Sequence, residues 1–175
     1  TFETYWNDSE FLPYSDASKE HLRRALSKEK RTDSDIVPVF DIEPYSFQKE
    51  ILERIKAERT LHQNYRNLIV AATGTGKTVI SAFDYKNLAA NKGQYPRLLF
   101  VAHREEILKQ SLQVFRGILK DQNFGDLLVG SNEANQIEHL FISIQSFNSK
   151  NLIDITQPDF YDIIIIDEFH HAAAP

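Results

Sequence analysis

Two short, unbroken aliphatic runs constrain the fold of this chain more than any other feature. Residues 97–102 read RLLFVA and residues 161–167 read YDIIIID, without alternation of polar and apolar positions. Strands of that kind are buried on both faces, as in parallel sheets, and parallel strands need long crossover connections. Helical periodicity over residues 46–62, 77–90 and 105–120 supplies such connections. We therefore predict a three-layer α/β domain around a mostly parallel sheet.

Three further runs complete the expected sheet, namely residues 67–72, 126–130 and 139–144. Residues 1–40 lack a comparable pattern, so we predict an N-terminal extension or linker there. The α/β domain is then expected to occupy residues 41–175.

Composition narrows the class of protein. The chain has 25 acidic and 20 basic residues and a net charge of −5, which argues against coating nucleic acid by bulk charge but leaves a local patch open. It has no cysteine, which excludes disulfides and a thiol nucleophile. No aliphatic run approaches the roughly 20 residues of a membrane span. With no methionine and no signal-peptide pattern, we expect a piece of a longer cytoplasmic protein.

The segment Ala71–Thr78, AATGTGKT, has the composition of a phosphate-binding loop between a strand and a helix. Gly74 and Gly76 permit the backbone angles that let successive N–H groups curl around phosphate oxygens. The following helix adds positive charge at its N-terminus, Lys77 adds a cation, and the Thr78 hydroxyl is a candidate Mg²⁺ ligand. Ala71 stands where the general pattern has glycine, and a chance glycine-rich turn is the alternative.

Two carboxylates follow the run of four isoleucines. Asp167 and Glu168 stand at the carboxyl end of a predicted buried strand, the edge where open α/β sheets bind ligands. One carboxylate there can hold Mg²⁺ and the second can polarise a water.

Several ordered motifs resemble one enzyme family. Residues 167–170 (DEFH), together with the AxxGxGKT form of residues 71–78, resemble the DExH group of superfamily-2 helicases and translocases. Phe47-Gln48 resembles that family's adenine-reading element, residues 101–104 (VAHR) its motif Ia, and residues 143–146 (SIQS) a later nucleic-acid element. The nearest subgroup resembles the motor subunits of type I and type III restriction enzymes.

The resemblance implies a RecA-like motor domain that binds ATP and Mg²⁺. Gln48 would read the adenine with Phe47 or Tyr45 packed nearby, and Thr78 and Asp167 would hold Mg²⁺. Glu168 would activate the attacking water, with Lys77 and Asp167 as the other catalytic groups. The residues that would cradle the phosphates are Thr73, Gly74, Thr75, Gly76, Lys77 and Thr78.

Three more roles follow from the resemblance. His170 would couple nucleotide state to the next segment, and Arg104 and Gln145 would contact nucleic acid. Each contact has a plainer alternative: Gln48 as an exposed helix position, Arg104 as a surface ion pair with Glu105 or Glu106, and Gln145 as the cap of a short helix.

We therefore expect the ATP-binding first motor domain of a nucleic-acid-dependent ATPase, acting on DNA in restriction or repair. The resemblance implies a second RecA-like domain of the same chain, which supplies arginine fingers, and restriction or repair subunits as partners. These 175 residues alone are then expected to hydrolyse almost no ATP. The alternatives are a phosphate-loop ATPase that does not act on nucleic acid, and a non-catalytic interaction module that keeps a relic nucleotide fold.

Overall fold

In the computed structural model, the described residues are 42–130, 134–150, 152 and 156–167. The predicted N-terminal extension, residues 1–40, lies outside them. None of the described helices is long and apolar enough to cross a membrane.

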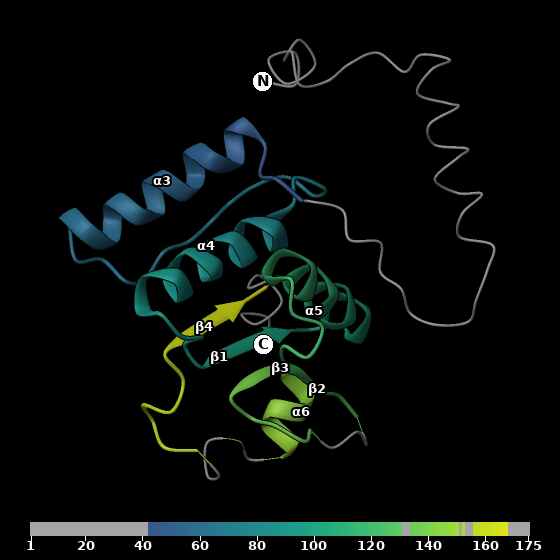
Figure 1. Ribbon diagram of the computed structural model, residues 1–175. Coiled ribbons are helices and arrows are strands. Elements are labelled where there is room, and N and C mark those ends of the chain that lie inside the picture. Colours follow the sequence, from purple (N-terminus) through teal and green to yellow (C-terminus); the bar gives the residue numbers. More distant parts are fainter. Residues whose placement is uncertain (1–41, 131–133, 151, 153–155, 168–175) are drawn as a thin grey trace, which may run out of the picture. The chain divides into compact units, whose positions relative to one another are not determined.

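A four-stranded sheet forms the centre of the described domain (Figure 1). Its strands are β1 (Leu98–Ala102), β2 (Asp126–Leu128), β3 (His139–Ser143) and β4 (Ile163–Ile166). They lie in the order β2-β3-β1-β4, and every neighbouring pair is parallel. The predicted parallel α/β sheet is confirmed.

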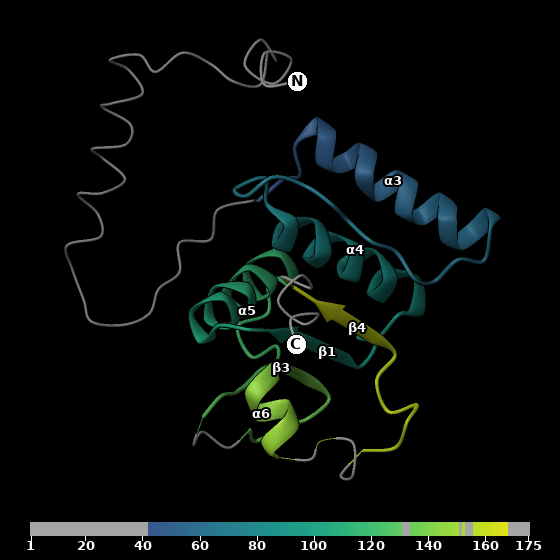
Figure 2. The same ribbon diagram turned by 180° about the vertical axis from the view of Figure 1, so that it is seen from behind.

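Helices cover both faces of this sheet. They are α3 (Ser46–Leu61), α4 (Lys77–Lys92), α5 (Glu105–Leu119) and α6 (Ile144–Ser149). Figures 1 and 2 show α4 and α5 on one face, α6 on the other, and α3 on the side of α4 away from the sheet.

Alternating positions of β1 explain these layers. Leu98 and Phe100 point into a core shared with α4 and α5, whereas Leu99 and Val101 pack in a second core on the α6 side. All of β1 is buried. A central strand needs apolar side chains on both faces, which is why its sequence is a continuous aliphatic run.

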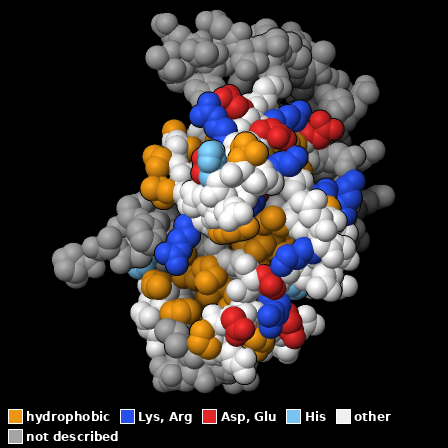
Figure 3. Space-filling model, turned by 90° about the vertical axis from the view of Figure 1, so that its left-hand side faces the viewer, with side chains coloured by type: hydrophobic (Ala, Val, Ile, Leu, Met, Phe, Trp, Pro, Cys, Tyr) orange, Lys and Arg blue, Asp and Glu red, His pale blue; other side chains and the backbone are white. Residues whose placement is uncertain are grey.

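The predicted strand over residues 67–72 is wrong. These residues form no strand, and Leu68 and Val70 are 79% and 86% exposed. Ile69 packs instead against the core of α3 and α4, so the run follows helices and has no partner strand to satisfy its backbone. Ile164 and Ile166 of β4 are also exposed, and hydrophobic side chains gather across the middle of the face seen in Figure 3.

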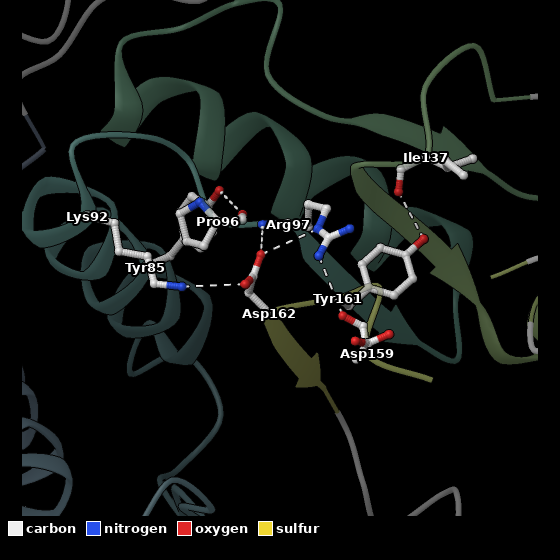
Figure 4. Close-up of polar contacts among 8 residues, drawn as sticks. All are labelled: Tyr85, Lys92, Pro96, Arg97, Ile137, Asp159, Tyr161 and Asp162. Atoms are coloured by element: carbon white, nitrogen blue, oxygen red, sulfur yellow. Dashed lines mark hydrogen bonds and ion pairs between the residues drawn. The ribbon is translucent and has the colours of Figure 1, made fainter. Parts of the chain in front are cut away.

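A polar cluster attaches the start of β4 to β1 (Figure 4). The Arg97 backbone N–H donates to Asp162 Oδ2 over 2.8 Å, and Lys92 Nζ lies 3.4 Å from Asp162 Oδ1. The Arg97 hydrogen bond, aided by the Lys92 charge, lowers the pKa of Asp162. Nearby, the Tyr161 hydroxyl donates to the Ile137 carbonyl over 2.9 Å. These contacts set the register of β4 and thereby the position of its carboxyl end.

At the amino end of β3, His139 lies among aromatic rings. Its ring stacks on Phe124 at 4.7 Å between centroids and meets Tyr95 edge-on at 6.1 Å. His139 Nδ1 is buried without a hydrogen-bond partner. Burial lowers the pKa of His139, and the charges of Glu138 and Asp121 oppose this only in part.

This histidine is expected to make the domain less stable in acid. Because the folded pKa is lowered, the unfolded chain takes up a proton that the folded chain does not. Its contribution to stability is thus complete at neutral pH and falls as the pH drops below about 6.5, by at most about 1.4 kcal/mol per pH unit. Urea unfolding at pH 7.5 and 5.5 measures the loss. The variant His139→Phe, which keeps an aromatic ring, should lose less stability between these pH values; equal losses would contradict the prediction.

Candidate nucleotide site

The loop that precedes α4 has the backbone geometry expected of a phosphate-binding turn. Gly74 and Gly76 have φ values of +83° and +77°, in the left-handed region that favours glycine. Gly76 is also the N-cap of α4, so the loop leads directly into a helix N-terminus. The first turn of α4 carries no acidic residue that would neutralise its positive end.

The Lys77 side chain turns back over this loop. Its Nζ donates to the carbonyls of Ala71 and Ala72 over 3.1 and 3.2 Å. The Thr75 hydroxyl donates to the same Ala72 carbonyl over 2.7 Å. An ammonium group, a hydroxyl and a helix N-terminus therefore gather at one short loop, and this donor set suits a phosphate chain.

Gln48, near the start of α3, is part of the same site. It is 2% exposed, so its alternative interpretation as an exposed helix position is wrong. Its Oε1 accepts a hydrogen bond from the Tyr45 N–H, and its Nε2 donates to the Thr75 carbonyl, each over 2.9 Å. The structure thus joins two segments that lie 27 residues apart in the sequence.

The aromatic rings that flank Gln48 stack on each other. The centroids of Tyr45 and Phe47 are 6.1 Å apart and their planes differ by 10°. Tyr45 is 50% exposed. Two stacked aromatic rings therefore stand at the start of α3, one and three residues before Gln48 in the chain.

Asp167 follows directly after β4. Its backbone N–H donates to the Val101 carbonyl over 2.9 Å, which continues the pairing of β4 with β1. Figures 1 and 2 both show α4 beginning on the side of the sheet toward which β1 and β4 point. Glu168 and His170 lie outside the described residues.

The predicted nucleic-acid residues stand at the ends of β1 and β3. Gln145 Nε2 lies 3.3 Å from His103 Nδ1, and both side chains are exposed. Ser143 caps α6, because its hydroxyl accepts from the Ser146 N–H, so the alternative that Gln145 is the cap is wrong.

Arg104 is the exposed N-cap of α5. Its neighbour Glu105 forms an ion pair with Lys109 over 2.7 Å, one turn further along the helix. This carboxylate therefore has another partner than the Arg104 side chain, which weakens the interpretation of Arg104 as half of a surface ion pair.

A comparison with protein families identifies the chain. The family model described as the res subunit of type III restriction enzymes matches residues 41–175. The chain belongs to this family. The match confirms the resemblance to restriction-enzyme motor subunits that the loop and the acidic strand end indicated. No curated protein matches the chain.

Two solved structures resemble this chain over 71% of its length. One is a nuclease-deletion mutant of the type ISP restriction-modification enzyme LlaGI with a DNA substrate mimic, at 18% identity and a TM-score of 0.42. The other is the ATP-dependent type ISP enzyme LlaBIII bound to DNA, at 19% identity and a TM-score of 0.37. The chain spans 12% and 8% of the length of those two proteins.

Two contacts were not predicted from the sequence. His103, part of the VAHR segment over residues 101–104, contacts Gln145, and its position directly after β1 was the signal that could have identified this contact. The Thr75 carbonyl, which accepts from Gln48, had no such signal, because a backbone acceptor is not visible in a motif.

Proposed function

We propose that this domain binds Mg·ATP and is the first motor domain of a DNA-dependent ATPase, a helicase or translocase. The observation that carries the proposal is the loop before α4, where two left-handed glycines lead into a helix N-terminus beside the Lys77 ammonium. Family membership in the type III restriction res subunits supports the same function.

The residues present suit the nucleotide and its metal. Loop N–H groups and Lys77 would hold the phosphates once the ammonium turns away from the Ala71 and Ala72 carbonyls. Mg²⁺ prefers oxygen ligands, and the Thr78 hydroxyl and the Asp167 carboxylate would supply them. When bound, the metal would neutralise charge at the transferred phosphate, and Glu168 would take a proton from the attacking water.

DNA would bind at the carboxyl ends of β1 and β3. His103, Arg104 and Gln145 are exposed there, and each offers polar groups to a phosphate or a base. His170 would couple this surface to the nucleotide, and a second RecA-like domain would complete the site with arginine groups. ATP hydrolysis by the full-length protein, measured with and without duplex DNA, tests the assignment, since a phosphate-loop ATPase unrelated to nucleic acid would not respond to DNA.

Gln48 is expected to make the site prefer ATP to GTP. Beyond its bonds to Tyr45 and Thr75, the Gln48 amide keeps a second N–H and a second oxygen lone pair, which can donate to one atom of the adenine edge and accept from another. Each such bond is worth about 1 kcal/mol net. The preference should thus be several-fold to tens-fold, and Gln48→Ala should remove it. Calorimetric titration with both nucleotides measures this. Equal binding of ATP and GTP by the unmodified protein would contradict a base-reading role.

A further inference from the structure

The hydrogen bonds of Gln48 indicate a second task for this residue, separate from the base. Its Oε1 faces the Tyr45 N–H, which can only donate, so the amide must present its NH₂ group to the Thr75 carbonyl. Both ends of the buried amide are therefore matched to the backbone. A side chain whose only role was to meet a base would need no such partners.

Gly76 makes room for this contact. A Cβ added at Gly76 would lie 2.7 Å from Gln48 Nε2, closer than real side chains allow. Glycine at this position thus serves two purposes, since it adopts a positive φ and also lets the amide approach the loop. The Gln48 side chain and the Thr75–Gly76 peptide are packed together as one unit.

The helix that carries Gln48 is held firmly on α4. Leu52 and Ile55 of α3 share a buried cluster with Ile80 of α4. Arg59 and Asp84 form a two-point ion pair between the same helices, with their side chains only 20% and 18% exposed. These contacts fix the position of α3, and so of Gln48, relative to α4.

Because the peptide bond is planar, the hydrogen bond from Gln48 to the Thr75 carbonyl also fixes the direction of the Gly76 N–H, a candidate phosphate donor. The Thr75 carbonyl and the Gly76 N–H belong to one peptide unit, and no peptide bond among the described residues is cis. In a trans peptide the C=O and the N–H point in opposite directions. By holding the Thr75 carbonyl on the α3 side, Gln48 determines that the Gly76 N–H faces away from α3.

We propose that Gln48 is a positioning residue that orients the Gly76 N–H toward phosphate through the Thr75 carbonyl, whatever base the nucleotide carries. The inference rests on the proposed phosphate site and adds a role that does not depend on adenine. A ligand with phosphates and no base should then also depend on Gln48.

The test is calorimetric titration of the chain with inorganic tripolyphosphate and Mg²⁺. One lost hydrogen bond should weaken binding about two- to tenfold in Gln48→Ala and in Gln48→Glu, which keeps an acceptor for Tyr45 but cannot donate to Thr75. Gln113→Ala, at an exposed position of α5, is the matched control and should bind as the unmodified chain does. Amide hydrogen exchange should speed up at residues 75–78 in both Gln48 variants and stay unchanged in the strands of the sheet.

The outcomes separate this inference from the proposed function. If Lys77→Ala weakens tripolyphosphate binding and both Gln48 variants bind normally, the positioning role is wrong and the phosphate site stands. If the unmodified chain does not bind tripolyphosphate, or binds it equally well without Lys77, the phosphate site and the positioning role both fall. Faster exchange spread over the whole domain, in place of the loop alone, would also overturn the inference.

Discussion

Replacing Lys77 with alanine is expected to weaken Mg·ATP binding by about 10- to 100-fold, since a hydrogen bond to a charged group contributes about 1.5–3 kcal/mol. The fold should survive. The ammonium contacts only loop carbonyls in the hydrogen bonds described, and alanine is a good helix former at the first position of α4. The backbone turn made by Gly74 and Gly76 would remain, so residual binding is expected rather than none.

Isothermal titration calorimetry measures the loss of Mg·ATP affinity, and a melting curve tests whether the fold survives. Lys56→Ala is the matched control, because Lys56 is an exposed lysine on α3 and its loss changes the net charge by the same amount. Normal ATP affinity in Lys77→Ala would contradict the phosphate-loop assignment. A loss of affinity of the same size in Lys56→Ala would show that bulk charge, and not this ammonium, attracts the nucleotide.

Replacing Glu168 with glutamine is expected to lower ATP hydrolysis by about 10²- to 10⁴-fold, the usual contribution of a general base. The amide has nearly the shape of the carboxylate but cannot accept the proton of the attacking water. Nucleotide binding should therefore persist. Asp167→Asn, in contrast, should weaken binding together with its Mg²⁺ dependence, since it removes a charged oxygen ligand.

Steady-state ATP hydrolysis with saturating duplex DNA measures this effect, in a form of the protein long enough to hydrolyse ATP. Glu53→Gln, at an exposed position of α3, is the control for a change of one acidic charge. Should Glu168→Gln hydrolyse ATP at the normal rate while Lys77→Ala still fails to bind it, the general base is another group.

Most of the fold could be predicted because its elements are locally distinct. The runs that became β1 and β4 are apolar at consecutive positions, and the helix over 105–119 has its apolar residues at helical spacing. The same rule failed at residues 67–72. An apolar run alone does not distinguish a strand from an irregular segment that packs on helices, and the segment around Ile69 packs on α3 and α4.

The candidate site likewise has one part that the sequence predicted and one part that it did not. The loop from Ala71 to Thr78 could be recognised from eight consecutive letters, since glycine conformation, lysine charge and the helix start are local properties. Gln48 could be singled out by its motif, but the motif pointed to a base and gave no sign of the Thr75 carbonyl.

By itself, the amino-acid sequence determined the parallel α/β class, the loop before α4 and the acidic residues after the four isoleucines, because each depends on side chains close together in the chain. Only the tertiary structure decided which distant groups meet. Gln48 reaches Thr75 across 27 residues because α3 packs on α4, and Gln145 reaches His103 across 42 residues because β3 pairs with β1. Contacts of that kind depend on how helices and strands pack, and no local pattern encodes them.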